Sequence, residues 1–358
     1  MNPLTRSRLL AVVVTVAAAV WAAPAAGATA APVSTSAMPA AVDQATPDTS
    51  TAIPRWLHQL PPQQYTTFDG QHSFTLTPWQ GQHVAVLVPD PRSGEVMAKI
   101  VGALDRAWSY YRSTTGRVPS PNRAINGRLP IAVVPDGDTC GAGCGWLGST
   151  GIEIAQPYFD ILYNQVSNQG LYDQVLFYEL GRNFWFYTDQ LTAPDNNAYR
   201  DAVTTGFAVL MRFQSMAAAH APGAPFNGTP FTTFRSQVAG LIDVYESDPT
   251  KTFAGTLGAD LSPGAYGGSD FFASIMMRLA ARHGGQAFLS RFWRHSVPGR
   301  GTATNTTAAV TNLVTSASAA ACVDLSRVFY QRWGFPRPDG TTTPRPAANT
   351  VPEPTGHC

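Results

Sequence analysis

The chain has 358 residues, of which 44% are hydrophobic and 13% are charged, and its formal net charge is +1. This hydrophobic fraction excludes a disordered protein, and the 31 Gly and 29 Pro residues predict a loop-rich globular one. No basic stripe runs along the sequence, which argues against nucleic acid as a partner.

The first thirty residues have the pattern of a secretory signal peptide. Arg6 and Arg8 precede an almost wholly apolar run from Leu9 to Ala23, and small residues follow it. The run is too short for a good membrane span. We therefore expect a signal peptide at 1–30, a secreted extracellular monomer, and no membrane span after cleavage; an uncleaved anchor is the alternative. Without Arg6 and Arg8, 22 of the 24 basic residues remain against 23 acidic ones.

Residues 31–51 are rich in Ala, Pro, Ser and Thr and predict a disordered linker. The stretch from Gln64 to Pro89 predicts strands, because "HSFTLTP" alternates and "HVAVLVP" is apolar and β-branched. A helix follows at 93–116, with Ser93 as a candidate cap. The later predicted elements are a buried strand at 128–136, a short strand at 145–155, helices at 171–187, 199–219, 269–285 and 285–296, and a closing segment at 324–335.

This order predicts an α+β fold, in which a strand-rich N-terminal part with a mixed sheet precedes a mainly helical part. We expect the folded domain to span residues 52–338. Residues 339–358 are rich in Pro and Thr and form a tail.

The chain contains four cysteines, Cys140, Cys144, Cys322 and Cys358. An exported protein meets oxidising conditions, so two disulfides are expected, and four cysteines allow three pairings. Sequence proximity favours Cys140–Cys144 and Cys322–Cys358, which would tie down the tail. A four-thiolate zinc site is the weaker alternative, because only one compact half-site is present.

Residues 178–182 read "YELGR" and match a zinc-binding H-E-x-x-H helix only at Glu179. In such a helix two histidines one turn apart bind the metal, and the glutamate acts as general base on the metal-bound water. One match in five letters is weak, so its weight depends on the surrounding segments.

Taken together, these segments resemble the gluzincin metallopeptidases, especially their enhancin-like, mucin-degrading branch. "YELGRNFW" is similar to that family's H-E-L-G-H-N-F/W helix, and "TTGFA" to its N-E-G-F-A motif. "GWLGSTGIEIA" at 145–155 resembles the strand that receives the substrate backbone, and 268–293 and 324–335 resemble supporting segments. The resemblance covers about residues 85–336 and implies a thermolysin-like or gluzincin-like catalytic subdomain.

The family's zinc ligands would fall at positions 178, 182 and 205, which hold Tyr178, Arg182 and Thr205. Arginine has no lone pair for a metal and its charge repels Zn²⁺, tyrosine ligates only as a phenolate, and threonine is a poor neutral donor. The seven histidines include no i, i+4 pair, and we expect them at the surface or in loops. We therefore expect no zinc and no other cofactor.

Glu179 and Arg182 are three residues apart, so they can meet on one helix face. One interpretation is a buried or half-buried ion pair that fills the vacated metal hole. In the other, Arg182 binds a ligand's carboxylate or phosphate, while Glu179 holds a substrate group or activates water and Tyr178 donates to an oxyanion. Because a neighbouring cation lowers a carboxyl pKa, we expect Glu179 to be a weak base, which favours binding over hydrolysis.

The resemblance also provides candidate substrate-binding residues: Gly151, Ile152 and Glu153 of the short strand, and Thr205. Tyr187 could line the substrate pocket, although aromatic residues are more often part of the core. For Glu153, solvent exposure on an alternating strand is the favoured alternative. Asp136 and Asp138 suit calcium or a turn, and Asp270 suits the first turn of a helix.

Three functions remain open from the sequence. The favoured one is a secreted metallopeptidase-like pseudoenzyme that binds an extracellular peptide, glycoprotein or glycan in the former cleft. The second is an active hydrolase that uses Glu179 with Arg182 and Tyr178. The third is a structural or inhibitory protein with a plugged cleft.

Overall fold

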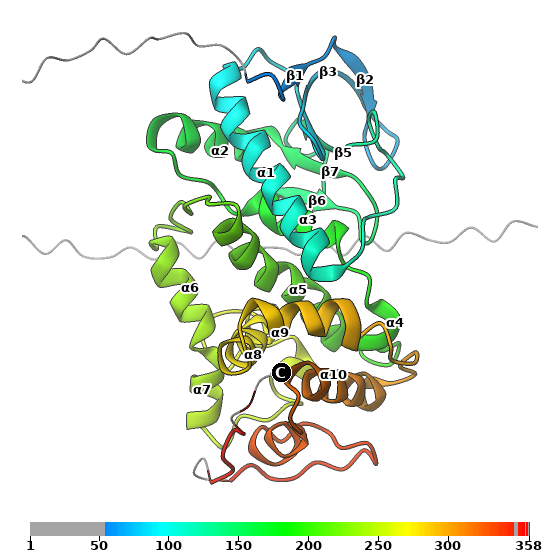
Figure 1. The fold of residues 1–358 in the computed structure, drawn as a ribbon, viewed down its shortest axis with the longest axis vertical. Coiled ribbons are helices and arrows are strands. Elements are labelled where there is room, and N and C mark those ends of the chain that lie inside the picture. The colour runs from blue at the N-terminus through cyan, green and yellow to red at the C-terminus, as the bar shows by residue number, and fades with distance from the viewer. Residues whose placement is uncertain (1–53, 347–349, 355, 357) are drawn as a thin grey trace, which may run out of the picture. The chain divides into compact units, whose positions relative to one another are not determined.

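The computed structural model describes residues 54–346, 350–354, 356 and 358. The predicted signal peptide (1–30) and linker (31–51) lie outside these residues. The described residues from Pro54 onward form one compact unit (Figure 1). Within the described part, none of the helices combines the length and the apolar character that a bilayer crossing requires.

The strand-rich part forms one mixed sheet in the order β1-β3-β4-β5-β7-β6, with β2 paired to β3. The β4–β5 and β5–β7 pairs are parallel, and the remaining pairs are antiparallel. The strands are β1 (His58–Gln59), β2 (Gln63–Thr66), β3 (Ser73–Gln80), β4 (Val84–Val88), β5 (Leu129–Val134), β6 (Gly143–Gly145) and β7 (Ile152–Ala155).

Helices make up most of the chain after β7, which confirms the predicted α+β class. The α-helices are α1 (Gly94–Thr115), α2 (Gln156–Gln169), α3 (Val175–Asn183), α4 (Thr188–Leu191), α5 (Asn197–Ala218), α6 (Phe231–Ala239), α7 (Leu241–Ser247), α8 (Gly268–Arg282), α9 (Gln286–Ser290) and α10 (Thr306–Ala321). Shorter helical segments are η1 (Leu257–Ala259), η2 (Arg291–Ser296) and η3 (Val328–Arg332), the last two of them π-helical.

The central strand β4 is buried on both faces, which explains its uninterrupted apolar sequence. Val84, Val86 and Val88 belong to the main core beneath the helices, whereas Ala85 and Leu87 join a smaller cluster on the other face. Side chains alternate between the faces of a strand, so this division follows directly from the period of two. The same alternation decides which face of the sheet Glu153 of β7 points to.

Helix α1 is fastened to the sheet by a buried carboxylate. Asp105 accepts hydrogen bonds from the backbone N–H groups of Gln82, His83 and Val84, at 2.7, 2.8 and 3.0 Å. One turn and a half later, Tyr111 donates to the carbonyl of Phe177 at 2.7 Å and so ties α1 to α3. These bonds lock α1 between the β3–β4 turn and the helix that carries Glu179.

Two boundaries differ from the sequence prediction. The predicted strand at 145–155 is two antiparallel strands, β6 and β7, separated by a turn in which Gly148 has φ of 69° and Gly151 has φ of 134°. The predicted helix at 171–187 is only α3, because the chain leaves helical geometry after Asn183 and the N–H of Trp185 bonds back to the Arg182 carbonyl. Ser93 stands at the start of α1 as expected, but its side chain makes no cap hydrogen bond.

Both predicted disulfides are present, Cys140–Cys144 and Cys322–Cys358. The second one holds the end of the chain beside α10. The tail also reaches the end of α8, where the Nδ1 atom of His283 lies 2.8 Å from the Gly356 carbonyl oxygen. His283 is 1% exposed and lies in the turn that follows α8, so it is buried but still one of the histidines expected in loops.

The contact between α5 and α8 provides a test of the packing. A Cβ added to Gly206 would lie 2.7 Å from Cδ1 of Phe272 and 2.8 Å from the carbonyl oxygen of Ser269. The backbone and the buried ring cannot both yield, so Gly206→Ala should lower the free energy of unfolding by about 1–3 kcal/mol. Urea denaturation followed by far-UV circular dichroism measures this change.

Gly240→Ala is the matched control. Gly240 already has φ of −76°, and its added Cβ would meet the Ser236 carbonyl oxygen at 3.4 Å, an ordinary contact. This variant should leave stability unchanged or raise it by up to about 1 kcal/mol. Equal stability of the two variants would contradict the close packing of α5 on α8.

Candidate functional site

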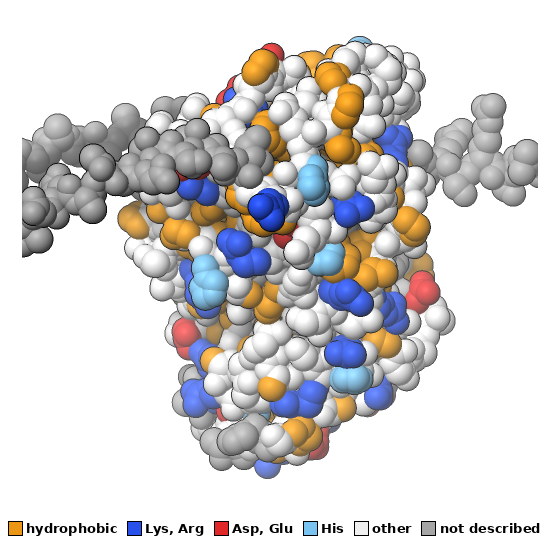
Figure 2. All heavy atoms as spheres, turned by 45° about the horizontal axis from the view of Figure 1, so that its top comes forward, with side chains coloured by type: hydrophobic (Ala, Val, Ile, Leu, Met, Phe, Trp, Pro, Cys, Tyr) orange, Lys and Arg blue, Asp and Glu red, His pale blue; other side chains and the backbone are white. Residues whose placement is uncertain are grey.

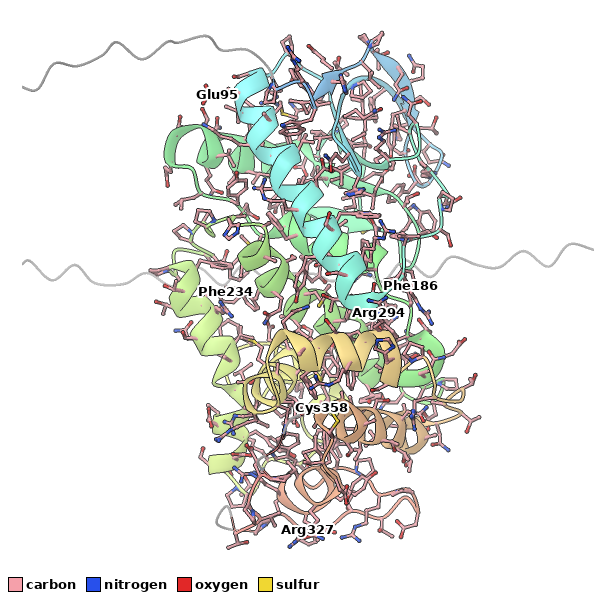
Figure 3. All side chains as sticks on the ribbon, in the orientation of Figure 1. Glu95, Phe186, Phe234, Arg294, Arg327 and Cys358 are labelled. Atoms are coloured by element: carbon pink, nitrogen blue, oxygen red, sulfur yellow. A yellow bond between two sulfur atoms is a disulfide. The ribbon has the colours of Figure 1, made fainter. Side chains whose placement is uncertain are left out.

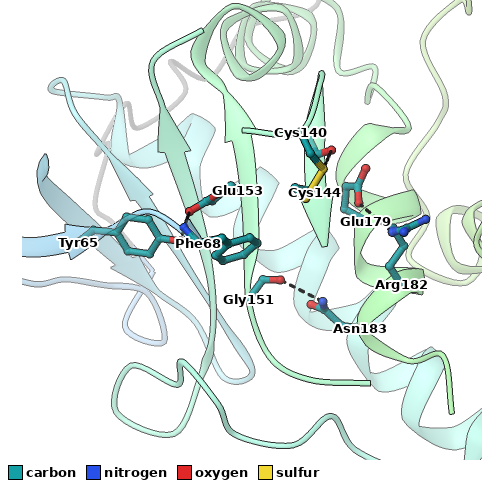
Figure 4. Close-up of a disulfide and its surroundings, with 10 residues drawn as sticks. Tyr65, Phe68, Cys140, Cys144, Gly151, Glu153, Glu179, Arg182 and Asn183 are labelled. Carbon is teal, nitrogen blue, oxygen red and sulfur yellow. Dashed lines mark hydrogen bonds and ion pairs between the residues drawn. A yellow bond between two sulfur atoms is a disulfide. The ribbon is translucent and has the colours of Figure 1, made fainter. Parts of the chain in front are cut away.

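The candidate site lies where α3 passes directly beneath β6 (Figure 4). A Cβ on Gly143 would lie 3.2 Å from Cγ of Glu179, and one on Gly145 only 2.5 Å from the Glu179 carbonyl oxygen. Larger residues at these two positions would therefore push the strand off the helix. The two glycines let β6 cover Glu179, whose side chain is only 6% exposed.

Burial controls the chemistry of Glu179. It raises the pKa of this carboxyl from 4.5 to about 7, while Arg182 and the backbone of Gly145 act in the opposite direction. The expectation that Arg182 would hold the pKa of Glu179 below its ordinary value is therefore wrong. The reason is distance and desolvation, because Nε of Arg182 lies 3.9 Å from Oε2 of Glu179, which makes no hydrogen bond within the described residues.

Arg182 is the more accessible member of the pair. Its side chain is 26% exposed, and Asp201 on α5 acts on it electrostatically. The structure thus brings Glu179 and Arg182 together as the sequence predicts, with the carboxylate covered and the arginine side chain partly exposed.

Tyr178 lies between two cations. Arg182 is on its own helix, and the guanidinium carbon of Arg212 on α5 is 5.9 Å from the centre of the Tyr178 ring. Burial raises the pKa of Tyr178, so it remains a neutral phenol that can donate a hydrogen bond. Arg212 is 7% exposed, and its Nη2 atom lies 3.5 Å from Oδ1 of Asp270. The sequence carries no signal for this residue, because a lone arginine in an apolar helix forms no recognisable motif.

Asn183 is a positioning residue that sequence reasoning noted only as a matching letter. Its Nδ2 group donates to the carbonyl oxygens of Trp146 at 2.8 Å and Gly151 at 3.0 Å. The N–H of Gly148 also donates to the Arg182 carbonyl. These bonds fix the end of α3 against the turn between β6 and β7.

Strand β6 is the end strand of the sheet order. Ala142 accepts from the N–H of Ala155, and the N–H of Trp146 donates to Gly151. In an antiparallel pair the bonded positions alternate, so Gly143 and Gly145 direct their N–H and C=O groups away from β7. The sequence places the strand that would receive a substrate backbone at 145–155. The free edge of the sheet is instead β6 at 143–145, whereas Ile152 and Glu153 lie in the neighbouring strand β7.

Glu153 lies on the other face of the sheet from Glu179 (Figure 4). It accepts from the Tyr65 hydroxyl at 2.9 Å and from the Phe68 N–H at 2.6 Å. At 2% exposure, it contradicts the favoured expectation of solvent exposure. Its register partner is Ala132, a member of the smaller cluster, so alternation turns Glu153 inward to that cluster. Burial raises the pKa of Glu153 to about 7.

The other candidate residues occupy different places. Ile152 is fully buried in β7, and the Gly151 carbonyl accepts from Asn183. Tyr187 is fully buried, and its hydroxyl donates to the Trp293 carbonyl at 2.7 Å, so it is part of the core in this structure. Helix α5 contacts α3 at Ala208, whose Cα would lie 3.0 Å from a Cβ added to Gly181. Thr205 lies one turn before Ala208, in the same part of α5.

The donor set does not fit a gluzincin-type zinc ion. Position 178 is a neutral phenol, position 182 is a cation, and position 205 is a hydroxyl. Among the described residues no group of three or more His, Cys, Asp or Glu side chains is placed to hold a metal ion, and this includes the surroundings of Asp136 and Asp138. Asp270 accepts from the Gly267 N–H in the first turn of α8, as expected.

Comparison with known proteins gives little further information. No family model and no curated protein matches the chain. Among solved structures, a functionally unknown conserved protein from Bacillus anthracis str. Ames, in a mutant form, aligns with a TM-score of 0.47 and 11% identity over 73% of this chain and 48% of that one. Native yeast LTA4 hydrolase aligns with a TM-score of 0.42 and 12% identity over 81% of this chain and 46% of that one. The chain thus spans about half the length of these proteins, and the likeness is too weak to establish a family.

The buried carboxyl predicts a dependence of stability on pH. The unfolded chain releases the Glu179 proton near pH 4.5, whereas the folded chain retains it to about pH 7. This group's contribution to stability is therefore fully present below pH 4.5 and is lost as the pH rises through 7. Glu179→Gln should remove about 1–3 kcal/mol of the fall in unfolding free energy between pH 4.5 and 7.5, measured by urea denaturation across that range.

Glu95→Gln is the control, because Glu95 is exposed beside Lys99 on α1. It should leave the pH dependence almost unchanged. Part of the fall in unfolding free energy should persist in Glu179→Gln, because the pKa of Glu153 is also raised. A pH profile that is the same for Glu179→Gln as for the wild type would show that Glu179 is ionised and solvated at neutral pH.

Proposed function

We propose that the chain is a secreted, zinc-free relative of the gluzincin peptidases that binds an extended extracellular peptide along the free edge of β6. The observation that carries this proposal is the pair of outward-directed backbone positions, Gly143 and Gly145, above a helix whose former ligand positions hold Tyr178 and Arg182. The motif resemblance and the leader sequence support the metallopeptidase-like and secreted parts of the proposal.

Backbone pairing would supply the affinity. An exposed sheet edge accepts an extended segment as an added strand, and the ladder hydrogen bonds do not depend on the ligand's sequence. The disulfide Cys140–Cys144 ends within β6 and restrains this edge before any ligand arrives. A restrained edge loses less conformational entropy when a ligand pairs with it.

Arg182 would supply selectivity. Its side chain is about a quarter exposed and starts beside Gly145, where a Cβ would lie 3.2 Å from that of Arg182. A guanidinium in this position suits a carboxylate on the ligand through its planar fork. The substrate class is therefore an acidic peptide or glycopeptide segment.

Binding of labelled ten-residue extended peptides, with and without one acidic residue, tests this function. Fluorescence polarisation should show preference for the acidic peptides, and Arg182→Ala should weaken their binding by about 10-fold or more. Arg182→Lys should recover part of the loss, because it keeps the charge but not the fork. Arg327→Ala, an exposed arginine near the end of the fold, should bind as the wild type does.

Hydrogen exchange locates the bound peptide. The Gly143 amide should gain protection, because it points away from β7 and would join the new ladder. No protection in β6, or no binding by any peptide, would contradict this function and favour a structural protein with a plugged cleft. One equivalent of tightly bound zinc in the purified protein would contradict the zinc-free assignment.

Residual hydrolysis is the second candidate, and one observation favours it. The pKa of Glu179 is raised to about 7, which is the range in which a carboxylate works as general base near neutrality. The purified chain should then cleave peptides or mucin-type glycopeptides, with a rate that rises with pH through about 7. Glu179→Gln should lower kcat by about 10²–10⁴-fold without loss of folding. Turnover that persists in Glu179→Gln would exclude Glu179 as the base.

A further inference from the structure

Helix α1 carries two adjoining cavities, of about 360 and 380 Å³, and neither is lined by a residue of β6 or α3. Ser109 and Ser113 line both cavities, which therefore adjoin each other, and we call the pair of cavities the α1 groove. Each volume falls within the range of small-ligand pockets. The part of α1 that lines these cavities runs from Asp105 to Ser113, a length of about 12 Å along the helix.

Two guanidinium groups in the α1 groove lack acidic partners. Arg112 and Arg294 both line the first cavity and are exposed, and neither guanidinium forms an ion pair or hydrogen bond with another residue that the structure describes. Half-buried arginines elsewhere do pair, as Nε of Arg332 does with Oε1 of Glu246 at 2.6 Å. An arginine side chain that is held in a cavity without a carboxylate is available to an external anion.

The protein holds both guanidiniums in place. The guanidinium carbon of Arg112 lies 5.8 Å from the centre of the Trp108 ring. Arg294 lies across Gly116, which has φ of 68° and no side chain; a Cβ there would be 2.7 Å from Cγ of Arg294. Figure 3 shows Arg294 near the C-terminal end of α1. The first cavity therefore presents two restrained, positively charged forks rather than two freely moving side chains.

The second cavity adds a cation and no free anion. Arg106 lines it, and the acidic residue that lines it, Asp105, is buried and already accepts three backbone hydrogen bonds. Figure 2 shows Lys, Arg and His side chains spread over this side of the molecule with few acidic ones among them. The groove as a whole therefore attracts negative charge.

The polar lining narrows the ligand class. Ser109 and Ser113 use their hydroxyl protons on the carbonyls of Asp105 and Tyr110, so their lone pairs can accept hydrogen bonds from ligand hydroxyl groups. The exposed residue Gln82 also lines the second cavity and has both donors and an acceptor. The serine hydroxyls of the groove lie on the same helix as Arg106 and Arg112, so the lining suits a ligand that carries both hydroxyl and acidic groups.

Nucleic acid and peptide fit less well. Single-stranded nucleic acid needs open aromatic faces for its bases, but the Trp108 ring stacks on His83 at 4.0 Å and has Arg112 over it. An extended peptide needs a free strand edge, and the groove follows a helix whose backbone bonds are internal. A chain of sugars needs neither of these features.

We propose that the α1 groove binds an acidic saccharide, a sugar chain that carries sulfate or carboxylate groups, with Arg112 and Arg294 on one acidic group and Arg106 on the next. The site is separate from the β6 edge, so this proposal and the peptide-binding function can fail independently. Binding here would hold the protein on an acidic glycan while β6 remains free.

Isothermal titration calorimetry of the full chain tests the proposal with three probes: a sulfated heparin hexasaccharide, a carboxylated oligogalacturonate of the same length, and neutral maltohexaose. The first two should bind and the neutral one should not, and added NaCl should weaken binding. Arg112→Ala and Arg294→Ala should each reduce affinity by about 10-fold or more, and the double variant by more than either alone. Arg327→Ala is the control, and Figure 3 shows Arg327 at one end of the fold, away from Arg294.

Lysine variants keep the test valid if an alanine variant does not fold. Arg112→Lys and Arg294→Lys keep the charge and lose the fork, so they should bind between wild type and the alanine variants. Equal affinity of the double alanine variant and Arg327→Ala would overturn the proposal. It would also be overturned if maltohexaose bound as tightly as the acidic chains, or if inorganic sulfate alone bound as tightly as the hexasaccharide.

Discussion

The close approach of β6 to α3 is the constraint on which the candidate site depends. It is possible only because Gly143 and Gly145 have no side chains where the strand crosses Glu179. The same approach removes water from the Glu179 carboxyl, raises its pKa and leaves Oε2 without a hydrogen bond to any residue that the structure describes. Asn183 maintains the arrangement by bonding to the turn that connects β6 with β7. Substitutions in this turn would therefore alter the acidity of a carboxyl on a different element.

Positions 178, 182 and 205, where the gluzincin peptidases have zinc ligands, carry side chains of different charge and chemistry in this chain. Arg182 and Arg212 bring two fixed positive charges to the neighbourhood of Tyr178, and burial keeps the phenol neutral. Fixed guanidiniums can offset a carboxylate but cannot polarise a bound water as a Lewis acid does. The site is consequently better suited to hold an anionic ligand group than to generate a nucleophile, unless Glu179 itself acts as the base.

Two surfaces with different chemistry follow from this architecture. The β6 edge presents backbone groups, which recognise the shape of an extended chain. The α1 groove presents Arg112 and Arg294, which recognise acidic groups. Asp105 links the groove to the sheet, because it caps the β3–β4 turn beneath the groove and leaves the arginines as the groove's available charges.

The sequence by itself determined the α+β order of elements, the helices α1, α5 and α8, the pairing of the cysteines, and the unsuitability of Tyr178, Arg182 and Thr205 as zinc ligands. These follow from periodicity, proximity and donor chemistry, which are local properties. It did not predict α10, whose Thr, Ser and Ala residues give little amphipathic pattern. Only the tertiary structure decided that Glu153 turns inward, that β6 rather than β7 is the edge strand, and that the Glu179 pKa rises. Each of these depends on which distant elements exclude water from a side chain, and burial by a distant element leaves no mark in the local sequence.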